Sequence, residues 1–203
     1  MTIQFPRLPF CRYADDGLVH CRSLKQAEYV RERLAQRLKE CGLELHPVKT
    51  RIVYCKDHNR RQQYDCMQFD FLGYNFRPRR SLDRYGRLFS SFSPAIAPSA
   101  AKALRQEVRG WHLQLKSDKS LEELARVFDP VIKGWLQYYC KFRASAFDAV
   151  ARYINRAIVR WAMRKFKKLR DHKCRAVEWV LRIAQTRPHL FAHWRAGFKF
   201  AAR

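Results

Sequence analysis

The chain has 203 residues, 47% of them hydrophobic, and its 42 Lys and Arg against 18 Asp and Glu give a formal net charge of +24. This length and composition predict a folded core. The sequence has no run of about 18 uncharged apolar residues, so no membrane span is predicted. The first residues also lack the pattern of a secretory signal, so we expect a cytoplasmic location. The positive charge predicts a polyanionic partner, and nucleic acid is favoured over a membrane surface.

The first half of the chain opens with two β-favouring runs, at 9–13 and 17–22. They flank Ala14, Asp15 and Asp16, which predicts a hairpin with both carboxylates at its tip. Adjacent carboxylates can bind the divalent cations that promote phosphoryl transfer. The alternative is an ordinary polar turn, because Asp is favoured in turns.

The rest of this half is predicted to mix helix and strand, so we expect an α+β fold. A capping box at Ser23 begins a helix that Gly42 ends, and this helix is expected to cover one face of a sheet. Further strands are predicted at 43–45, 51–55 and 69–76.

The chain changes character at 94–98, after which it is predicted to be helical almost throughout. The residues from 99 onward carry 24 basic and 8 acidic side chains, against 18 and 10 before them. Helices are expected from Ser99 to about residue 115, from a capping box at Ser120, from Asp129 as N-cap of Pro130, and from Ser145 to about residue 169.

The longest predicted helix carries two stripes. One is apolar, and Trp161 in it is expected to lie in the core, as is Trp135 on the preceding helix. The other is a basic ridge without an acid, which predicts salt-sensitive contacts with a phosphate backbone, the alternative being a solvated helix face. The ridge consists of Arg152, Arg156, Arg160, Arg164 and Lys168.

Further basic residues of this half are candidates for nucleic-acid contact, because lysine and arginine are seldom fully buried. They are Arg109, Lys133, Lys141 and Arg143. Aromatic residues interleave with them, and some could stack on unpaired bases, although most are expected to be core.

Cysteine usage predicts neither disulfides nor zinc. The seven cysteines form no C-x-x-C pair, which favours reduced thiols. Cys55, His58 and Cys66, or His172 with Cys174, supply too few suitably spaced ligands for a zinc site.

Four segments of the sequence resemble one family. Tyr-Ala-Asp-Asp at 13–16 resembles the catalytic hairpin of reverse transcriptases, and its neighbours are similar to the group II intron branch. GLELHPVKTRIVYC at 42–55 is similar to the next block of that family, and FDFLGYNF at 69–76 to its primer-grip hairpin. SLEELARVFDPVIKGWLQYYCKF at 120–142 is similar to its maturase domain, which forms the thumb.

The resemblance, which covers roughly residues 5–170, implies RNA-directed DNA synthesis with two Mg²⁺ ions. It also implies binding to intron RNA, template and primer, and assistance with splicing. Asp15 and Asp16 would hold the metals, and Lys49 would assist the departing pyrophosphate. The primer end or nucleotide would lie against Tyr13, Ala14, Phe71, Leu72, Gly73 and Tyr74.

The resemblance also implies a domain organisation. Residues 1–94 would be part of a polymerase palm made of antiparallel hairpins with one covering helix, and residues 95–170 an all-α thumb or maturase domain. Residues 171–203 would form a basic C-terminal tail, too short for the endonuclease domain that some family members carry.

One departure from the family limits the expected activity. The family places its fingers and a third metal-binding aspartate ahead of the Tyr-Ala-Asp-Asp hairpin, but this sequence has no Asp or Glu before Asp15. We therefore expect the chain alone to bind metal weakly and to polymerise nothing. Two functions stay open: a polymerase completed by a separate chain that supplies the fingers, and a non-catalytic RNA-binding splicing module.

Overall fold

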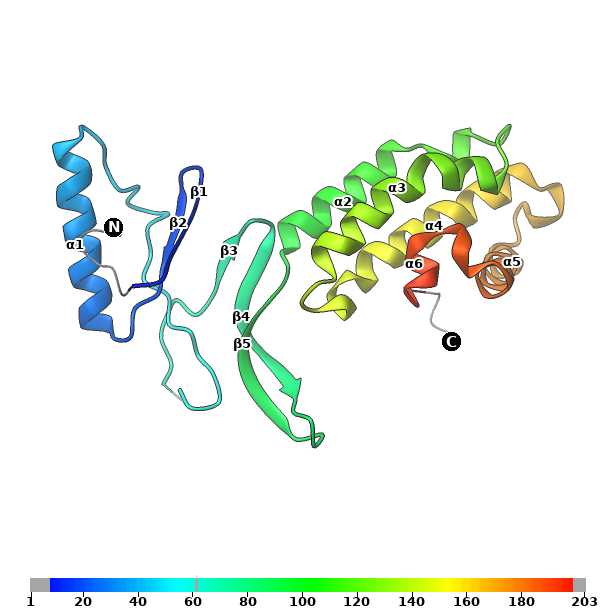
Figure 1. Ribbon diagram of the computed structural model, residues 1–203. Coiled ribbons are helices and arrows are strands. Elements are labelled where there is room, and N and C mark those ends of the chain that lie inside the picture. Colours follow the sequence, from blue (N-terminus) through cyan, green and yellow to red (C-terminus); the bar gives the residue numbers. More distant parts are fainter. Residues whose placement is uncertain (1–7, 61, 199–203) are drawn as a thin grey trace. The chain divides into compact units, whose positions relative to one another are not determined.

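The computed structural model describes residues 8–60 and 62–198 (Figure 1). Within these residues two small sheets and six α-helices form an α+β fold, as predicted. The chain divides into two compact units. Unit 1 comprises the described residues up to Phe71 together with Arg77–Phe92, and unit 2 comprises Leu72–Phe76 and the described residues from Ser93 onward.

The predicted first hairpin is confirmed. Strand β1 (Phe10–Tyr13) pairs antiparallel with β2 (Asp16–Val19). Ala14 in the turn has φ +52°, a left-handed conformation that costs a residue with a Cβ atom about 1–2 kcal/mol. The Arg12 Nε donates a hydrogen bond of 2.7 Å to the Ala14 carbonyl, and this contact supports the turn.

Helix α1 (Leu24–Glu40) begins and ends where the sequence predicts. The Ser23 hydroxyl accepts a hydrogen bond of 3.2 Å from the N–H of Gln26, and Gly42 follows the last turn with φ +70°. Val30 is the one buried residue of this helix, so α1 packs lightly against the rest of unit 1.

The strands predicted at 43–45 and 51–55 are wrong. These residues follow an irregular path, with a turn at 47–49. The N–H of Tyr54 donates to the Cys66 carbonyl at 2.9 Å, but one such bond does not make a ladder. β-favouring side chains form a strand only when a neighbouring strand satisfies the backbone groups in register.

The second sheet has the order β3-β4-β5, formed by β3 (Phe69–Phe71), β4 (Tyr74–Leu82) and β5 (Leu88–Ile96). The single strand predicted at 69–76 is therefore interrupted. Leu72 and Gly73 both have positive φ, at +50° and +74°, as a two-residue hairpin turn of type I′ requires.

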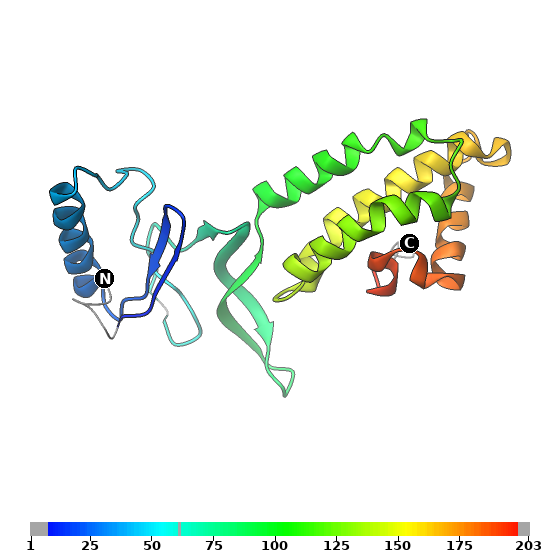
Figure 2. The same ribbon diagram turned by 45° about the horizontal axis from the view of Figure 1, so that its top comes forward.

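Unit 2 is a helical domain with α4 at its centre. Helices α2 and α5, and the 3₁₀ helix that follows α2, pack against α4, and Figures 1 and 2 show α2, α3 and α4 side by side. The α-helices are α2 (Pro98–Gly110), α3 (Leu121–Tyr139), α4 (Asp148–Lys165), α5 (Lys173–Thr186) and α6 (Ala192–Arg195). The 3₁₀ helices are Leu113–Leu115, Ala144–Phe147, Lys167–Leu169 and Pro188–Leu190.

The predicted helix start at Asp129 is wrong. The capping box at Ser120 is present, but α3 continues through Pro130 to Tyr139. The Asp129 carboxylate instead accepts a hydrogen bond of 2.5 Å from the N–H of Ala192, at the start of α6. A contact with a residue 63 positions away in sequence thus decides the role of this aspartate.

The described residues from 171 to 198 pack as helices and do not extend as a tail. Helix α5 packs on α4, and α6 packs on α3. His193 and Trp194 are fully buried, and each is hydrogen-bonded at 2.8 Å to the Oδ1 atom of Asn155 on α4. The helical domain therefore includes the described residues up to 198.

Candidate functional site

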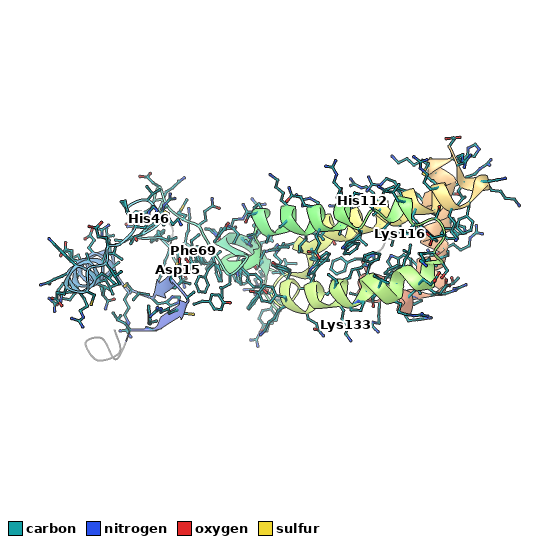
Figure 3. The ribbon with its side chains drawn as sticks, turned by 90° about the horizontal axis from the view of Figure 1, so that it is seen from above. Asp15, His46, Phe69, His112, Lys116 and Lys133 are labelled. Carbon is teal, nitrogen blue, oxygen red and sulfur yellow. The ribbon has the colours of Figure 1, made fainter. Side chains whose placement is uncertain are left out.

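The two carboxylates of the first hairpin are accessible. Asp15 lies in the turn, and Figure 3 shows it at the end of the hairpin, while Asp16 begins β2 opposite Tyr13. Directly opposed residues project from the same face of a hairpin. Tyr13, Ala14, Asp15 and Asp16 are all exposed, and Tyr13 keeps 63% of its surface.

Asp15 and Asp16 do not complete a metal centre. Across the part of the chain that the structure describes, no cluster of three or more His, Cys, Asp or Glu side chains could hold an ion. Catalytic Mg²⁺ ions are held by carboxylates together with waters and substrate phosphates, so two neighbouring aspartates are a partial ligand set for two ions. The hairpin therefore offers two ligands, and the residues described do not fit a complete two-metal site.

Lys49 lies in the irregular segment that follows α1. Its backbone N–H donates to the Nδ1 atom of His46, which Figure 3 labels, at 3.3 Å, and its side chain is exposed. Among the described residues, no hydrogen bond or ion pair joins Lys49 to Asp15 or Asp16.

The turn between β3 and β4 packs on the C-terminal end of α3. The Tyr138 hydroxyl donates to the Leu72 carbonyl at 2.8 Å, and the Tyr74 hydroxyl donates to the Tyr138 carbonyl. A Cβ atom added to Gly73 would lie 3.1 Å from the Tyr139 hydroxyl oxygen. This close approach explains why glycine occupies the position.

Only part of the predicted primer-contacting segment is accessible. Tyr74 is 7% exposed, and its ring packs against Tyr138, Tyr139 and Phe142. Burial raises the pKa of Tyr74 and of Tyr139. Tyr74 therefore anchors the turn to α3, whereas Leu72, which is 37% exposed, stays accessible. Phe71, at the end of β3, is half-buried.

Helix α4 presents a face made only of arginine. Every exposed residue between 150 and 165 is one of Arg152, Arg156, Arg160 and Arg164. No carboxylate of the described residues forms an ion pair with them, and the opposite side of the helix is buried around Trp161. We call these four residues the α4 arginine face.

Lys168, predicted as the end of this ridge, lies outside α4. The helix ends at Lys165 because Phe166 is extended, with φ −105° and ψ 116°, and a 3₁₀ helix follows. Lys168 is exposed there. Phe166 packs against Trp161 and Trp179, which fixes the path of the chain at this corner.

The remaining predicted basic residues are placed on different elements. Arg109 is exposed on α2, Lys133 is exposed on α3, where Figure 3 labels it, and Lys141 is exposed after α3. Arg143 is half-buried and takes part in an interaction within the chain. Arg143 is therefore the weakest of these candidates for nucleic-acid contact.

The two tryptophans predicted to be core differ in burial. Trp161 is fully buried, and its Nε1 donates to the Lys116 carbonyl at 3.0 Å. Trp135 is half-buried and stacks on Trp111 at 5.5 Å between ring centroids, and Phe128 stacks on the same Trp111 at 4.6 Å. These rings fill the space between α2 and α3.

A neighbouring stretch of α3 is exposed although it is apolar. Val127 and Tyr138 keep 63% and 46% of their surfaces, and a Cβ atom added to Gly134 would meet no atom within 4 Å. A glycine inside a helix costs about 1 kcal/mol relative to alanine, and nothing in the surroundings of Gly134 requires one. The sequence pattern does not single out this face, because apolar residues at helical spacing predict a core position.

Two family comparisons match the chain. Residues 2–76 match the family described as reverse transcriptase (RNA-dependent DNA polymerase), and residues 101–179 match the group II intron, maturase-specific domain. None of the curated proteins compared with the sequence matches it. Within residues 8–60 and 62–198, no helix is long and apolar enough to span a bilayer.

The two matches fall on the two halves that the sequence distinguishes. Reverse transcriptases are nucleotidyltransferases that use divalent metal, and the maturase domain implies binding of intron RNA and a role in splicing. The order of the two matches along the chain agrees with the motifs at 13–16, 42–55, 69–76 and 120–142. The chain therefore belongs to the group II intron reverse transcriptase and maturase family.

Proposed function

We propose that this chain binds group II intron RNA through the α4 arginine face of its maturase domain and assists splicing without polymerising on its own. The carboxylate hairpin then belongs to a palm that requires a further metal ligand. The observation that carries the proposal is the composition of α4, where every exposed position from 150 to 165 is arginine.

The geometry of this face suits a phosphate backbone. Arg152 and Arg164 are twelve residues apart, so the face extends about 18 Å along the helix axis at 1.5 Å per residue. Guanidinium groups form paired hydrogen bonds with phosphate oxygens. Because α4 is held from the other sides by α2 and α5, the face is presented on a rigid support.

Salt dependence distinguishes this role from that of a solvated helix face. Each phosphate neutralised on a duplex contributes about 0.9 to the slope of log K against log salt concentration. Replacing Arg156, Arg160 and Arg164 by Gln removes three such contacts. The slope for a structured intron RNA should then fall by about 2.7, and the affinity should fall with it.

A matched control removes the same charge elsewhere. Lys25, Arg31 and Lys39 are exposed on α1, and none of them forms an ion pair with a described residue. The triple Gln variant of these residues should leave the slope near its wild-type value. Equal slopes for the α4 variant and the wild-type chain would contradict the proposal.

Primer extension tests the proposed role of the carboxylate pair. Asp15 and Asp16 would contribute to metal binding in a complete palm, where Tyr13 and Ala14 would lie near the primer end. With Mg²⁺, template, primer and nucleotides, we expect no extension by the chain alone. Extension that disappears in the Asp15→Ala/Asp16→Ala variant would show that this chain completes its own palm.

A further inference from the structure

The hairpin formed by β4 and β5 carries a structured tip that lies between the two family matches, at 2–76 and 101–179. Its distal half extends away from the other elements of unit 1 in both ribbon views (Figures 1 and 2). The strands end at Leu82 and begin again at Leu88, and we call residues 82–88 the β4–β5 tip.

The tip has a fixed backbone conformation. The Asp83 Oδ1 atom accepts hydrogen bonds of 2.8 Å from the N–H groups of Tyr85 and Arg87. The N–H of Asp83 donates to the Arg87 carbonyl at 3.0 Å, and the N–H of Gly86 donates to the Asp83 carbonyl at 3.0 Å. Gly86 has φ +77°, which glycine adopts without strain. The carboxylate of Asp83, the single acidic residue of the tip, is therefore hydrogen-bonded to backbone N–H groups of the tip.

The tip displays apolar and cationic groups together. Tyr85 is 66% exposed, and the Cζ atoms of Arg84 and Arg87 lie 4.7 Å and 5.5 Å from the centroid of its ring. Leu82 and Leu88 beside it are 65% and 69% exposed. Isolated exposed apolar residues are common, but three within seven residues on a rigid turn indicate a contact surface.

We propose that the β4–β5 tip binds unpaired bases of RNA, with Tyr85 as the stacking platform and Arg84 and Arg87 as phosphate or base contacts. The inference rests on the proposed function in that RNA is the partner. Bases splayed out of a helix stack on aromatic rings and on guanidinium planes, and this arrangement presents both. Bases paired inside a duplex are stacked on one another and are not available for such contacts.

Charge favours RNA over an apolar partner. Residues 77–88 contain five arginines, and their one acid is Asp83. A protein or lipid surface that covered Leu82 and Leu88 would also have to compensate the charge of the neighbouring guanidinium groups. A single-stranded polyanion satisfies both features, because its bases cover apolar surface while its phosphates compensate the charge.

The test compares a single-stranded RNA oligonucleotide with a blunt RNA duplex as probes for the full chain. Tyr85→Leu keeps an apolar residue but removes the ring, and it should weaken single-strand binding by about 5- to 150-fold. Its salt slope should be unchanged, and duplex binding should stay at the wild-type level. Arg84→Gln/Arg87→Gln should lower the single-strand slope by about 1.4.

Two controls separate this inference from the proposed function. Tyr64→Leu replaces another exposed tyrosine of unit 1, which is 41% exposed, and should leave both probes unaffected. The Gln variant of Arg156, Arg160 and Arg164 should weaken binding of the duplex. If Tyr85→Leu binds both probes as wild type does, the tip assignment is overturned even where the α4 variant weakens binding.

A further test uses the wild-type chain and therefore does not depend on whether a variant folds. Photocrosslinking of a 4-thiouridine oligonucleotide, followed by mass spectrometry, should give crosslinks within residues 82–88. Crosslinks confined to other peptides, or an equal loss of duplex and single-strand binding in Tyr85→Leu, would overturn the inference.

Discussion

His193 is a buried titratable group, and acid should destabilise the chain through it. Its side chain is fully buried beside Phe191 and Trp194, and burial lowers its pKa to about 3 from the ordinary value of 6.5. The Asn155 Oδ1 atom accepts from Trp194 Nε1 and lies 2.8 Å from His193 Nε2. Because this oxygen can only accept, Nε2 carries the proton of a neutral imidazole.

The direction and size of the effect follow from the two pKa values. The folded state keeps His193 neutral, so its contribution is fully present above pH 6.5 and is lost as the pH falls from there toward 3. A pH of 5 lies 1.5 units below the ordinary histidine pKa of 6.5, so the unfolded chain binds a proton at this residue while the folded chain does not. One unit is worth 1.36 kcal/mol, so unfolding should become easier by about 2 kcal/mol between pH 7.5 and 5.

Urea unfolding followed by tryptophan fluorescence measures this contribution. The wild-type chain should lose about 2 kcal/mol more than His193→Gln over the same pH range. The six other histidines are exposed and are common to both proteins. Equal pH dependence in the two chains would refute the reasoning, as would an imidazole NMR signal of His193 that titrates near pH 6.5 in the folded wild type.

Three further changes test contacts that position the sites. Gly73→Ala places a Cβ atom 3.1 Å from the Tyr139 hydroxyl at φ +74° and should destabilise by about 2–3 kcal/mol in urea unfolding. Gly86 also has a positive φ, but a Cβ atom added there would meet no atom within 4 Å. Gly86→Ala should therefore lower the free energy of unfolding by no more than about 1–2 kcal/mol, and a larger decrease would contradict this comparison. Asp129→Ala removes the acceptor for the Ala192 N–H and should cost about 1–2 kcal/mol, while Asp129→Asn should retain most of the stability.

Local periodicity predicted much of the helical domain. The apolar stripe that includes Val150, Ile154 and Trp161 is buried, and the arginines between them are exposed. Such a pattern follows from the helical repeat of 3.6 residues per turn, and the matching spacing of apolar residues is visible in the sequence itself. The Tyr-Ala-Asp-Asp hairpin was equally predictable, because its two strands are adjacent in the chain.

Contacts between distant residues decided what the sequence did not reveal. Asp129 followed by Pro130 favours a helix start, but the bond from Ala192 gives the aspartate another role. Tyr74 fits an accessible strand until Tyr138 and Phe142, over 60 residues later, cover its ring. β-favouring residues at 51–55 likewise stay irregular without a strand partner.

Protection of individual arginines from phenylglyoxal, with and without a group II intron RNA, tests the central claim most directly. Mass spectrometry reports the modification of each arginine in the intact wild-type chain. The account predicts that RNA protects Arg152, Arg156, Arg160 and Arg164, while Arg31 on α1 stays as reactive as in the free chain. If the four α4 arginines react equally in the free and the RNA-bound chain, the α4 arginine face does not bind the RNA.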